Sequence, residues 1–206
     1  MSTGFPGFNV SEKYKYLWYA PERTGSRGVA SILCFYGFKF EGLITPINSP
    51  NEIINNIYFR NYTHRYNQDK KYNDYKVICN TRNPYSRVFS LYKNYANKGT
   101  FKDYVYNITN NDYKEPKVRM LQEQIINIIK NPQIQKPPDY ILRLEYLGED
   151  IKKIPFIYDI LTEKQLNYMI IHGKEIDEWQ SFYDSDMKEI VYNVCKHQFD
   201  IFGYEK

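Results

Sequence analysis

The sequence predicts an α/β domain with a mostly parallel sheet. Three short segments rich in aromatic or β-branched residues read as buried strands, and each is followed by a pattern typical of an amphipathic helix. Arginines stand at two of the strand-to-helix turns. The length fits one domain, so we expect residues 1–12 to be a flexible lead-in and residues 13–206 to form the domain.

The first strand-to-helix unit spans residues 14–36. Residues 14–19 are mostly aromatic and predict a buried strand, which Pro21 ends. Gly25 and Gly28 allow the backbone to turn tightly and to approach a ligand. The helix that follows has apolar residues at the spacing of one helical face: Val29, Ile32, Leu33 and Tyr36.

Between the first and second units the sequence predicts a short strand at 41–45 and a further helix. Residues 49–52, SPNE, place Ser at the N-cap, Pro at the first helical position and Glu at the third. Residues 59–74 are polar, aromatic and basic, which fits either a solvated loop or the edge of a substrate cleft. The apolar face of the predicted helix consists of Ile53, Ile54, Ile57 and Tyr58.

The second unit begins with a strand predicted at 75–81. Arg82 ends this strand, Asn83 can cap the next helix, and Pro84 fits its first position. Gly99 is expected to close the helix. The predicted buried face of this helix is Val88, Leu91, Tyr92 and Tyr95.

The remaining segments continue the alternation. Thr100 and Asp103 predict the start of a short helix, and residues 140–144 predict the third strand. Asp184 or Ser185 should start the last helix, and the aromatic tail after it should dock on the domain. Further helices are predicted at 118–130, 147–154 and 162–171, and the last helix should bury Met187, Ile190, Val191, Val194 and Cys195.

Composition excludes several classes of protein. The net charge of +4 permits an anionic ligand but is too small to indicate a nucleic-acid coat or a polybasic membrane binder. Cys34, Cys79 and Cys195 lie far apart in apolar patterns, which predicts buried thiols in a reducing compartment and no metal site. With neither a signal pattern nor an apolar run of about 18 residues, we expect a soluble, cytoplasmic protein.

The two arginine-bearing turns predict an anion site. In a parallel sheet ligands lie beyond the carboxyl ends of the strands, which places residues 23–27 and 82–90 on one edge. A helix N-terminus reached through Gly, Thr and Ser offers N–H donors, and phosphate is its usual ligand. The alternative is an ordinary turn with surface arginines, in which Arg82 merely ends a strand and Arg87 lies on a solvated face. The turn is not a Walker A sequence.

The two turns resemble motifs of the sulfotransferase superfamily. Residues 21–27, PERTGSR, look like its 5′-phosphosulfate loop, and residues 82–92, RNPYSRVFSLY, match its 3′-phosphate motif at every fixed position. Residues 141–150, ILRLEYLGED, are similar to its E-x-L-x-x-D stretch, and residues 199–204, FDIFGY, resemble the tail of its carbohydrate-type branch. The resemblance implies a three-layer, P-loop-like fold with helices on both sides of a mostly parallel sheet.

The resemblance further implies a sulfuryl donor, 3′-phosphoadenosine 5′-phosphosulfate (PAPS), and no metal. Arg23 corresponds to the family's loop lysine, which touches the bridging and terminal oxygens. Glu22 is inserted before it, and Arg, unlike Lys, stays protonated and cannot give a proton to the leaving phosphate. The 5′-phosphate would be held by Thr24, Gly25 and Ser26 with Arg27 beside them, and the 3′-phosphate by Arg82 and Ser90.

Transfer to a hydroxyl also needs a general base. His64 is the candidate, because many family members place a histidine in the corresponding stretch, although a surface histidine is an equally good interpretation. Glu41 is the second choice. Trp18 reads as a core residue rather than an adenine platform.

Three functions remain open at this stage. The first is a PAPS-dependent sulfotransferase acting on a hydroxyl, with a sugar favoured as acceptor. The second is a non-catalytic protein that binds the nucleotide or a glycan and retains the fold. A P-loop kinase is the third and the least favoured, since the phosphate loop lacks the lysine-serine ending. The sequence indicates neither the particular acceptor nor the oligomeric state.

Overall fold

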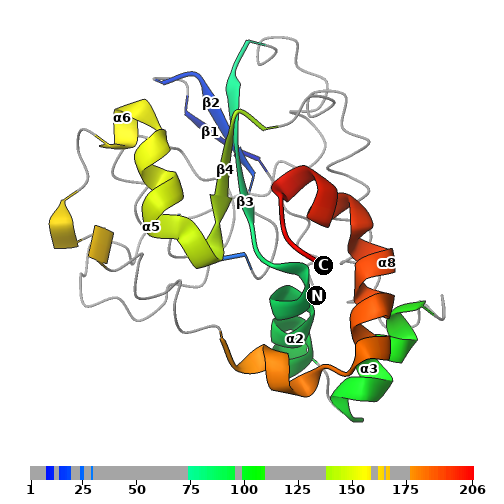
Figure 1. Ribbon diagram of the computed structural model, residues 1–206. Coiled ribbons are helices and arrows are strands. Elements are labelled where there is room, and N and C mark those ends of the chain that lie inside the picture. Colours follow the sequence, from blue (N-terminus) through cyan, green and yellow to red (C-terminus); the bar gives the residue numbers. More distant parts are fainter. Residues whose placement is uncertain are drawn as a thin grey trace.

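Four strands form one sheet in the order β1-β2-β3-β4 (Figure 1). The computed structural model describes residues 8–11, 14–19, 24, 25, 29, 74–95, 99–109, 138–158, 162–164, 166, 167 and 177–206. β2 is parallel to β3 and β3 is parallel to β4, whereas β1 is antiparallel to β2. The predicted α/β class with a mostly parallel sheet is confirmed for this part of the chain. The strands are β1 (Phe8–Ser11), β2 (Tyr16–Tyr19), β3 (Lys76–Thr81) and β4 (Tyr140–Arg143).

The three predicted strands fall where the sequence places them, within 14–19, 75–81 and 140–144. In the register, Trp18 lies beside Ile78, and Ile78 lies beside Tyr140. A run of buried residues explains the prediction of β3, because five of its six residues are buried. A continuous apolar run of this length is the pattern that a strand covered on both faces requires.

Residues 8–11, which the sequence places in a flexible lead-in, form the strand β1. Phe8–Ser11 pair along their whole length with Tyr16–Tyr19 and add an edge strand to the sheet. The sequence FNVS is short and contains only two strongly strand-favouring residues, so its local pattern is weak. It forms a strand because it pairs with the aromatic β2.

The two faces of the sheet are buried by different parts of the chain. On one face Trp18, Ile78 and Leu142, all fully buried, pack with Val29 and with the segment after β4. On the other face Leu17, Val77 and Cys79 pack against Phe202, near the end of the last helix. Figure 1 accordingly shows α5 (Leu147–Asp150) and α6 (Pro155–Tyr158) on one side of the strands and α8 (Ser185–Phe202) on the other.

A second core lies between three helices, α2 (Pro84–Tyr95), α3 (Phe101–Thr109) and α8 (Ser185–Phe202). Tyr85 lies at its centre, where Trp179 stacks on it and Tyr183 meets it edge-on. The Tyr183 hydroxyl donates to the Tyr85 carbonyl at 2.8 Å. Trp179 and Tyr183 therefore pack in this core.

The helix starts agree with the predicted capping residues. Thr100 and Asp103 bond reciprocally before α3: the Asp103 N–H donates to Thr100 Oγ1 at 3.1 Å, and the Thr100 N–H donates to Asp103 Oδ2 at 3.0 Å. Asp184 caps α8 by accepting from the Met187 N–H at 2.8 Å. In α8, Met187, Val191 and Cys195 are buried as predicted, whereas Ile190 and Val194 are half-buried.

The single helix predicted at 147–154 is instead a chain of short helical segments. Ile154 has an extended backbone (φ −88°, ψ 109°), and Pro155 then starts a new turn. Residues 163, 164, 166 and 167 are helical, as predicted, within 162–171. The consecutive short segments are η6 (Leu144–Tyr146), α5 (Leu147–Asp150), η7 (Ile151–Lys153) and α6 (Pro155–Tyr158). A further short helix, η8 (Asp177–Phe182), lies just before α8.

Several predicted elements lie outside the described residues. They are the strand at 41–45, the helix that starts at 49–52, the helix at 118–130 and most of the stretch at 59–74. Of the helix predicted after Gly28, the structure describes Val29, which is fully buried. Within the described part of the chain, no helix is both long and apolar enough to cross a membrane.

Candidate anion-binding site at the carboxyl edge of the sheet

Three segments that follow β2, β3 and β4 meet at the carboxyl edge of the sheet. Asn80, near the end of β3, accepts from the Trp18 indole N–H at 2.7 Å and donates through Nδ2 to the Thr24 carbonyl at 3.2 Å. Just beyond β3, the Asn83 N–H donates to Glu145 Oε1 at 2.8 Å. The expectation that the turns after the first two predicted strands share one edge is therefore confirmed for their described residues.

Gly25 lets the first turn lie close to the segment after β4. Its φ of +76° is a conformation that glycine adopts without strain. A Cβ atom built at this position would lie only 2.5 Å from Leu144 Cδ1. The Val29 N–H donates to the Gly25 carbonyl at 3.2 Å, which has the spacing of the first helical bond. Both the backbone conformation and the available space therefore favour glycine here.

Thr24, beside this glycine, is only 1% exposed. In this structure Thr24 therefore presents almost no surface to a ligand. The phosphate-binding roles of Thr24 and Gly25 remain predictions.

The second turn continues directly into α2. Asn83 Oδ1 accepts from the N–H groups of Tyr85 and Ser86 at 3.0 and 3.4 Å, as expected for the predicted cap, and Pro84 has no N–H to offer. The Asn83 side chain thus accepts hydrogen bonds from two of the backbone N–H groups in the first turn of α2. An anion at this turn would depend mainly on side chains, above all on Arg82.

Arg82 is held on the first turn of α2. Its Nε donates to Ser86 Oγ at 2.8 Å, and Ser86 is fully buried. Ser86 and Ser90 lie four residues apart and share one side of α2, and Arg82 bonds to the first of them. Ser86 was not among the predicted site residues, although its spacing from Arg82 and Ser90 was visible in the sequence.

Arg87 is 2% exposed, which excludes the solvated face that the sequence left as its alternative position. Its position in α2 follows from the wide burial of this helix, which packs on both α3 and α8.

Burial raises the pKa of the Cys79 and Cys195 thiols to about 12, although the Arg87 charge acts in the opposite direction. Both thiols are unpaired and buried, as predicted; Cys34 lies outside the described residues.

Glu145 connects this edge to the C-terminal tail. Besides accepting from Asn83, its carboxylate accepts through Oε2 from the Tyr204 hydroxyl at 3.1 Å. Asn80, Glu145 and Tyr204 were not among the site residues predicted from the sequence. These contacts join residues about 60 positions apart, and local patterns carry no signal for such pairs.

The other predicted site residues lie outside the described part of the chain. They are Arg23, Ser26 and Arg27 of the first turn, the candidate base His64 and its alternative Glu41. Ser90 is described and buried, at 7% exposed. Trp18 is fully buried and bonded to Asn80, which confirms it as a core residue.

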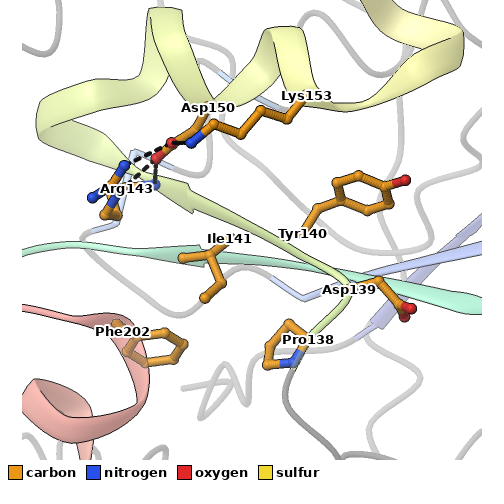
Figure 2. Close-up of a pocket in the computed structure, with 8 residues that line it drawn as sticks. All are labelled: Pro138, Asp139, Tyr140, Ile141, Arg143, Asp150, Lys153 and Phe202. Carbon is orange, nitrogen blue, oxygen red and sulfur yellow. Dashed lines mark hydrogen bonds and ion pairs between the residues drawn. The ribbon is translucent and has the colours of Figure 1, made fainter.

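A separate pocket of about 280 Å³ lies along β4 (Figure 2). The Asp150 carboxylate accepts there from Arg143 Nε and Nη2 at 2.9 and 2.8 Å and from Lys153 Nζ at 2.6 Å. On the other side of β4, Ile141 points toward Phe202 (Figure 2). Both cations of this pocket are paired with the Asp150 carboxylate.

Asp150 is a fixed anion inside the fold. Burial alone would raise the pKa of its carboxyl, but the hydrogen bonds and charges of Arg143 and Lys153 outweigh burial and lower that pKa below its ordinary value. Asp150 Oδ2 also accepts from the Arg143 N–H at 3.0 Å, at the end of β4. Among the described residues, no cluster of three or more His, Cys, Asp or Glu side chains is arranged to hold a metal ion.

Comparison of the chain with models of known protein families, with curated proteins and with solved structures finds no match.

Proposed function

We propose that this protein is a PAPS-dependent sulfotransferase that acts on a hydroxyl group, with a sugar as the favoured acceptor. The observation that carries the proposal is the convergence of two turns, at Thr24–Gly25 and at Arg82–Asn83, on one edge of a parallel sheet. Each turn belongs to a stretch that resembles one half of the family's nucleotide site. Side by side, they would bind the two phosphate-bearing ends of one nucleotide.

In this proposal each end of the nucleotide has its own residues. Arg82 and Ser90 hold the 3′-phosphate, because a guanidinium can form paired hydrogen bonds to phosphate and a hydroxyl adds another donor. Thr24, Gly25 and Ser26 hold the 5′-phosphate, with Arg23 and Arg27 beside it. Recognition of the 3′-phosphate would distinguish PAPS from ATP.

The proposed reaction is an in-line transfer. The acceptor oxygen forms a bond to the sulfur, and the bond between that sulfur and the 5′-phosphate oxygen breaks. The proton of the acceptor hydroxyl goes to a base, for which His64 is the candidate and Glu41 the alternative. Arg23 would stabilise the negative charge that develops on the leaving phosphate.

The finer fold assignment belongs to the same proposal. Burial of both faces of the sheet, by Val29 and the α5–α6 segment on one and by α8 on the other, supports a three-layer, P-loop-like arrangement. The unpaired buried thiols at Cys79 and Cys195 support a reducing, cytoplasmic location, which fractionation of cells that express the tagged protein would test.

Transfer of radiolabelled sulfur from PAPS to a panel of glycans tests the activity. We expect labelling of at least one acceptor and none with Arg82→Ala. Calorimetry with the product nucleotide, 3′-phosphoadenosine 5′-phosphate, tests binding separately. If the wild-type chain does not bind this nucleotide, the proposal is wrong.

A second candidate is a protein that binds the nucleotide without turning it over. The first turn favours it, because Glu22 is inserted and Arg23 replaces the usual lysine. Arginine keeps the charge but does not donate a proton to the leaving phosphate. Nucleotide binding without transfer to any acceptor would support this candidate, and gain of transfer in Arg23→Lys would show that the arginine is the cause.

A further inference from the structure

Glu145 joins two segments that the chain keeps far apart. Its Oε1 accepts from the backbone N–H of Asn83 at 2.8 Å, and its Oε2 accepts from the Tyr204 hydroxyl at 3.1 Å. One carboxylate thus connects the turn that carries Arg82, the segment after β4 and the C-terminal tail. Both bonds are charge-assisted, which makes them stronger than bonds between neutral groups.

The tail that carries Tyr204 is itself firmly placed. After α8 the chain turns at Gly203, whose φ is +70°, and the N–H groups of Gly203 and Tyr204 both donate to the Phe199 carbonyl, at 3.0 and 3.2 Å. Phe202 is buried against Leu17, Val77 and Cys79. Burial and the adjacent Glu145 charge raise the pKa of Tyr204, so its hydroxyl keeps the proton that it donates. Tyr204 is therefore a fixed support for one side of the carboxylate.

We propose that Glu145 is a positioning residue for the nucleotide site, which holds the Arg82–Asn83 turn against the C-terminal tail. Asn83 follows Arg82 directly and caps α2, so a displacement of its backbone would also displace the guanidinium. This inference rests on the proposed function, in which Arg82 binds the 3′-phosphate.

The charge of Glu145 makes the inference easy to test. A carboxylate next to an anion site repels the anion, so simple electrostatics predicts that its removal strengthens nucleotide binding. Positioning predicts the opposite for Glu145→Ala, which loses both hydrogen bonds. Glu145→Gln separates the two effects, since its amide oxygen can accept from Asn83 and its amide N–H can donate to a Tyr204 hydroxyl that has rotated.

The experiment is calorimetric titration of the full chain with 3′-phosphoadenosine 5′-phosphate. We expect Glu145→Ala to weaken binding about tenfold, or about 1.4 kcal/mol, and Glu145→Gln to stay within about twofold of wild type or to bind more tightly. Tyr204→Phe should weaken binding about threefold, and adding it to Glu145→Ala should cause no further loss. Binding by Glu145→Ala that equals or exceeds wild type would overturn the inference, as would an equal loss in Glu145→Gln.

Amide hydrogen exchange at Asn83, measured by NMR without nucleotide, tests the clamp independently. Exchange should accelerate on the order of tenfold in Glu145→Ala and stay near the wild-type rate in Glu145→Gln. If Glu145→Ala does not fold, the nucleotide affinities of Glu145→Gln and Tyr204→Phe still test the inference. If the wild-type chain binds no nucleotide, the proposed function fails; unchanged exchange in Glu145→Ala would refute the clamp itself.

Discussion

Two arginines stand at the ends of neighbouring strands and are held in different ways. Arg143, the last residue of β4, forms two side-chain hydrogen bonds to the Asp150 carboxylate, which also accepts from Lys153. Arg82, just after β3, is oriented through Nε by a neutral hydroxyl, that of Ser86. The Asp150 carboxylate opposes the charge of Arg143, whereas the Ser86 hydroxyl that orients Arg82 is itself uncharged.

The two arginines also lie in different surroundings. Asp150 is 1% exposed and also accepts from the Arg143 backbone N–H, so the Arg143 pair closes the end of an outer strand in the described sheet. Arg82 and Ser86 lie beside Asn80 and Asn83, in the segment that contacts both other turns. We therefore expect changes at Arg82 to alter binding and changes at Asp150 to alter stability.

The largest expected effect is the loss of nucleotide affinity in Arg82→Ala. Binding of 3′-phosphoadenosine 5′-phosphate should weaken about 100-fold, or about 2.8 kcal/mol, because a charge-assisted contact to phosphate is lost. Binding of adenosine 5′-phosphate, which lacks the 3′-phosphate, should change little. Calorimetry with both nucleotides measures the difference, and Lys153→Ala serves as a control for the loss of one positive charge. Equal losses of affinity for the two nucleotides would show that Arg82 does not bind the 3′-phosphate.

Asp150→Ala should lower the free energy of unfolding by about 2–3 kcal/mol, because the buried end of β4 loses its acceptor and Arg143 loses its partner. Urea denaturation measures this change. Nucleotide affinity of the folded variant should match wild type. A large loss of nucleotide affinity in Asp150→Ala, with little loss of stability, would show that the Asp150–Arg143 pair supports binding and not the fold.

The same carboxylate predicts a dependence of stability on pH. The pKa of Asp150 is lower in the folded chain than its ordinary value of 3.8, so its contribution is complete above that value. The contribution should disappear as the pH falls below 3.8 through the folded pKa. Denaturation of wild type and Asp150→Asn across this range should show a steeper loss in wild type.

Gly25→Ala should cost about 1.5–2 kcal/mol of stability, since the new Cβ meets Leu144 and the backbone keeps a positive φ. Gly203→Ala is a matched control, because its φ is +70° but no atom lies within 4 Å of the added Cβ. The control should lose about 1 kcal/mol from backbone strain alone. Equal losses in the two variants, measured by urea denaturation, would show that the Leu144 contact does not matter.

Ser86→Ala should have the smallest effect, a nucleotide affinity about fourfold weaker, or about 0.8 kcal/mol. The variant removes the hydroxyl that orients Arg82 but leaves the guanidinium in place. Calorimetry measures the loss, and Ser181→Ala, on an exposed segment, is the control. If Ser86→Ala binds like wild type, the guanidinium needs no support from that hydroxyl.

The sequence predicted the elements whose signals are local. Continuous buried runs indicated β2 and β3, and capping residues indicated the starts of α2, α3 and α8. The edge strand β1 was missed, because its four residues depend on β2 for their pairing. The burial of Arg87 was left open, since a lone arginine in a helix pattern usually faces water.

The candidate site was predictable to a similar extent. Parallel strands bring their carboxyl ends to one edge, so the meeting of the two turns followed from the fold class. The contacts that fix the turns, from Asn80 to Thr24 and from Asn83 to Glu145, required the three-dimensional structure. They join residues that no spacing rule connects.

A crystal structure with bound 3′-phosphoadenosine 5′-phosphate tests the central claim most directly. We predict the 3′-phosphate within hydrogen-bond distance of Arg82 and Ser90, and the 5′-phosphate against the backbone of Thr24 and Gly25. A nucleotide bound elsewhere, for example in the pocket along β4, or bound with only one phosphate at these turns, would contradict it.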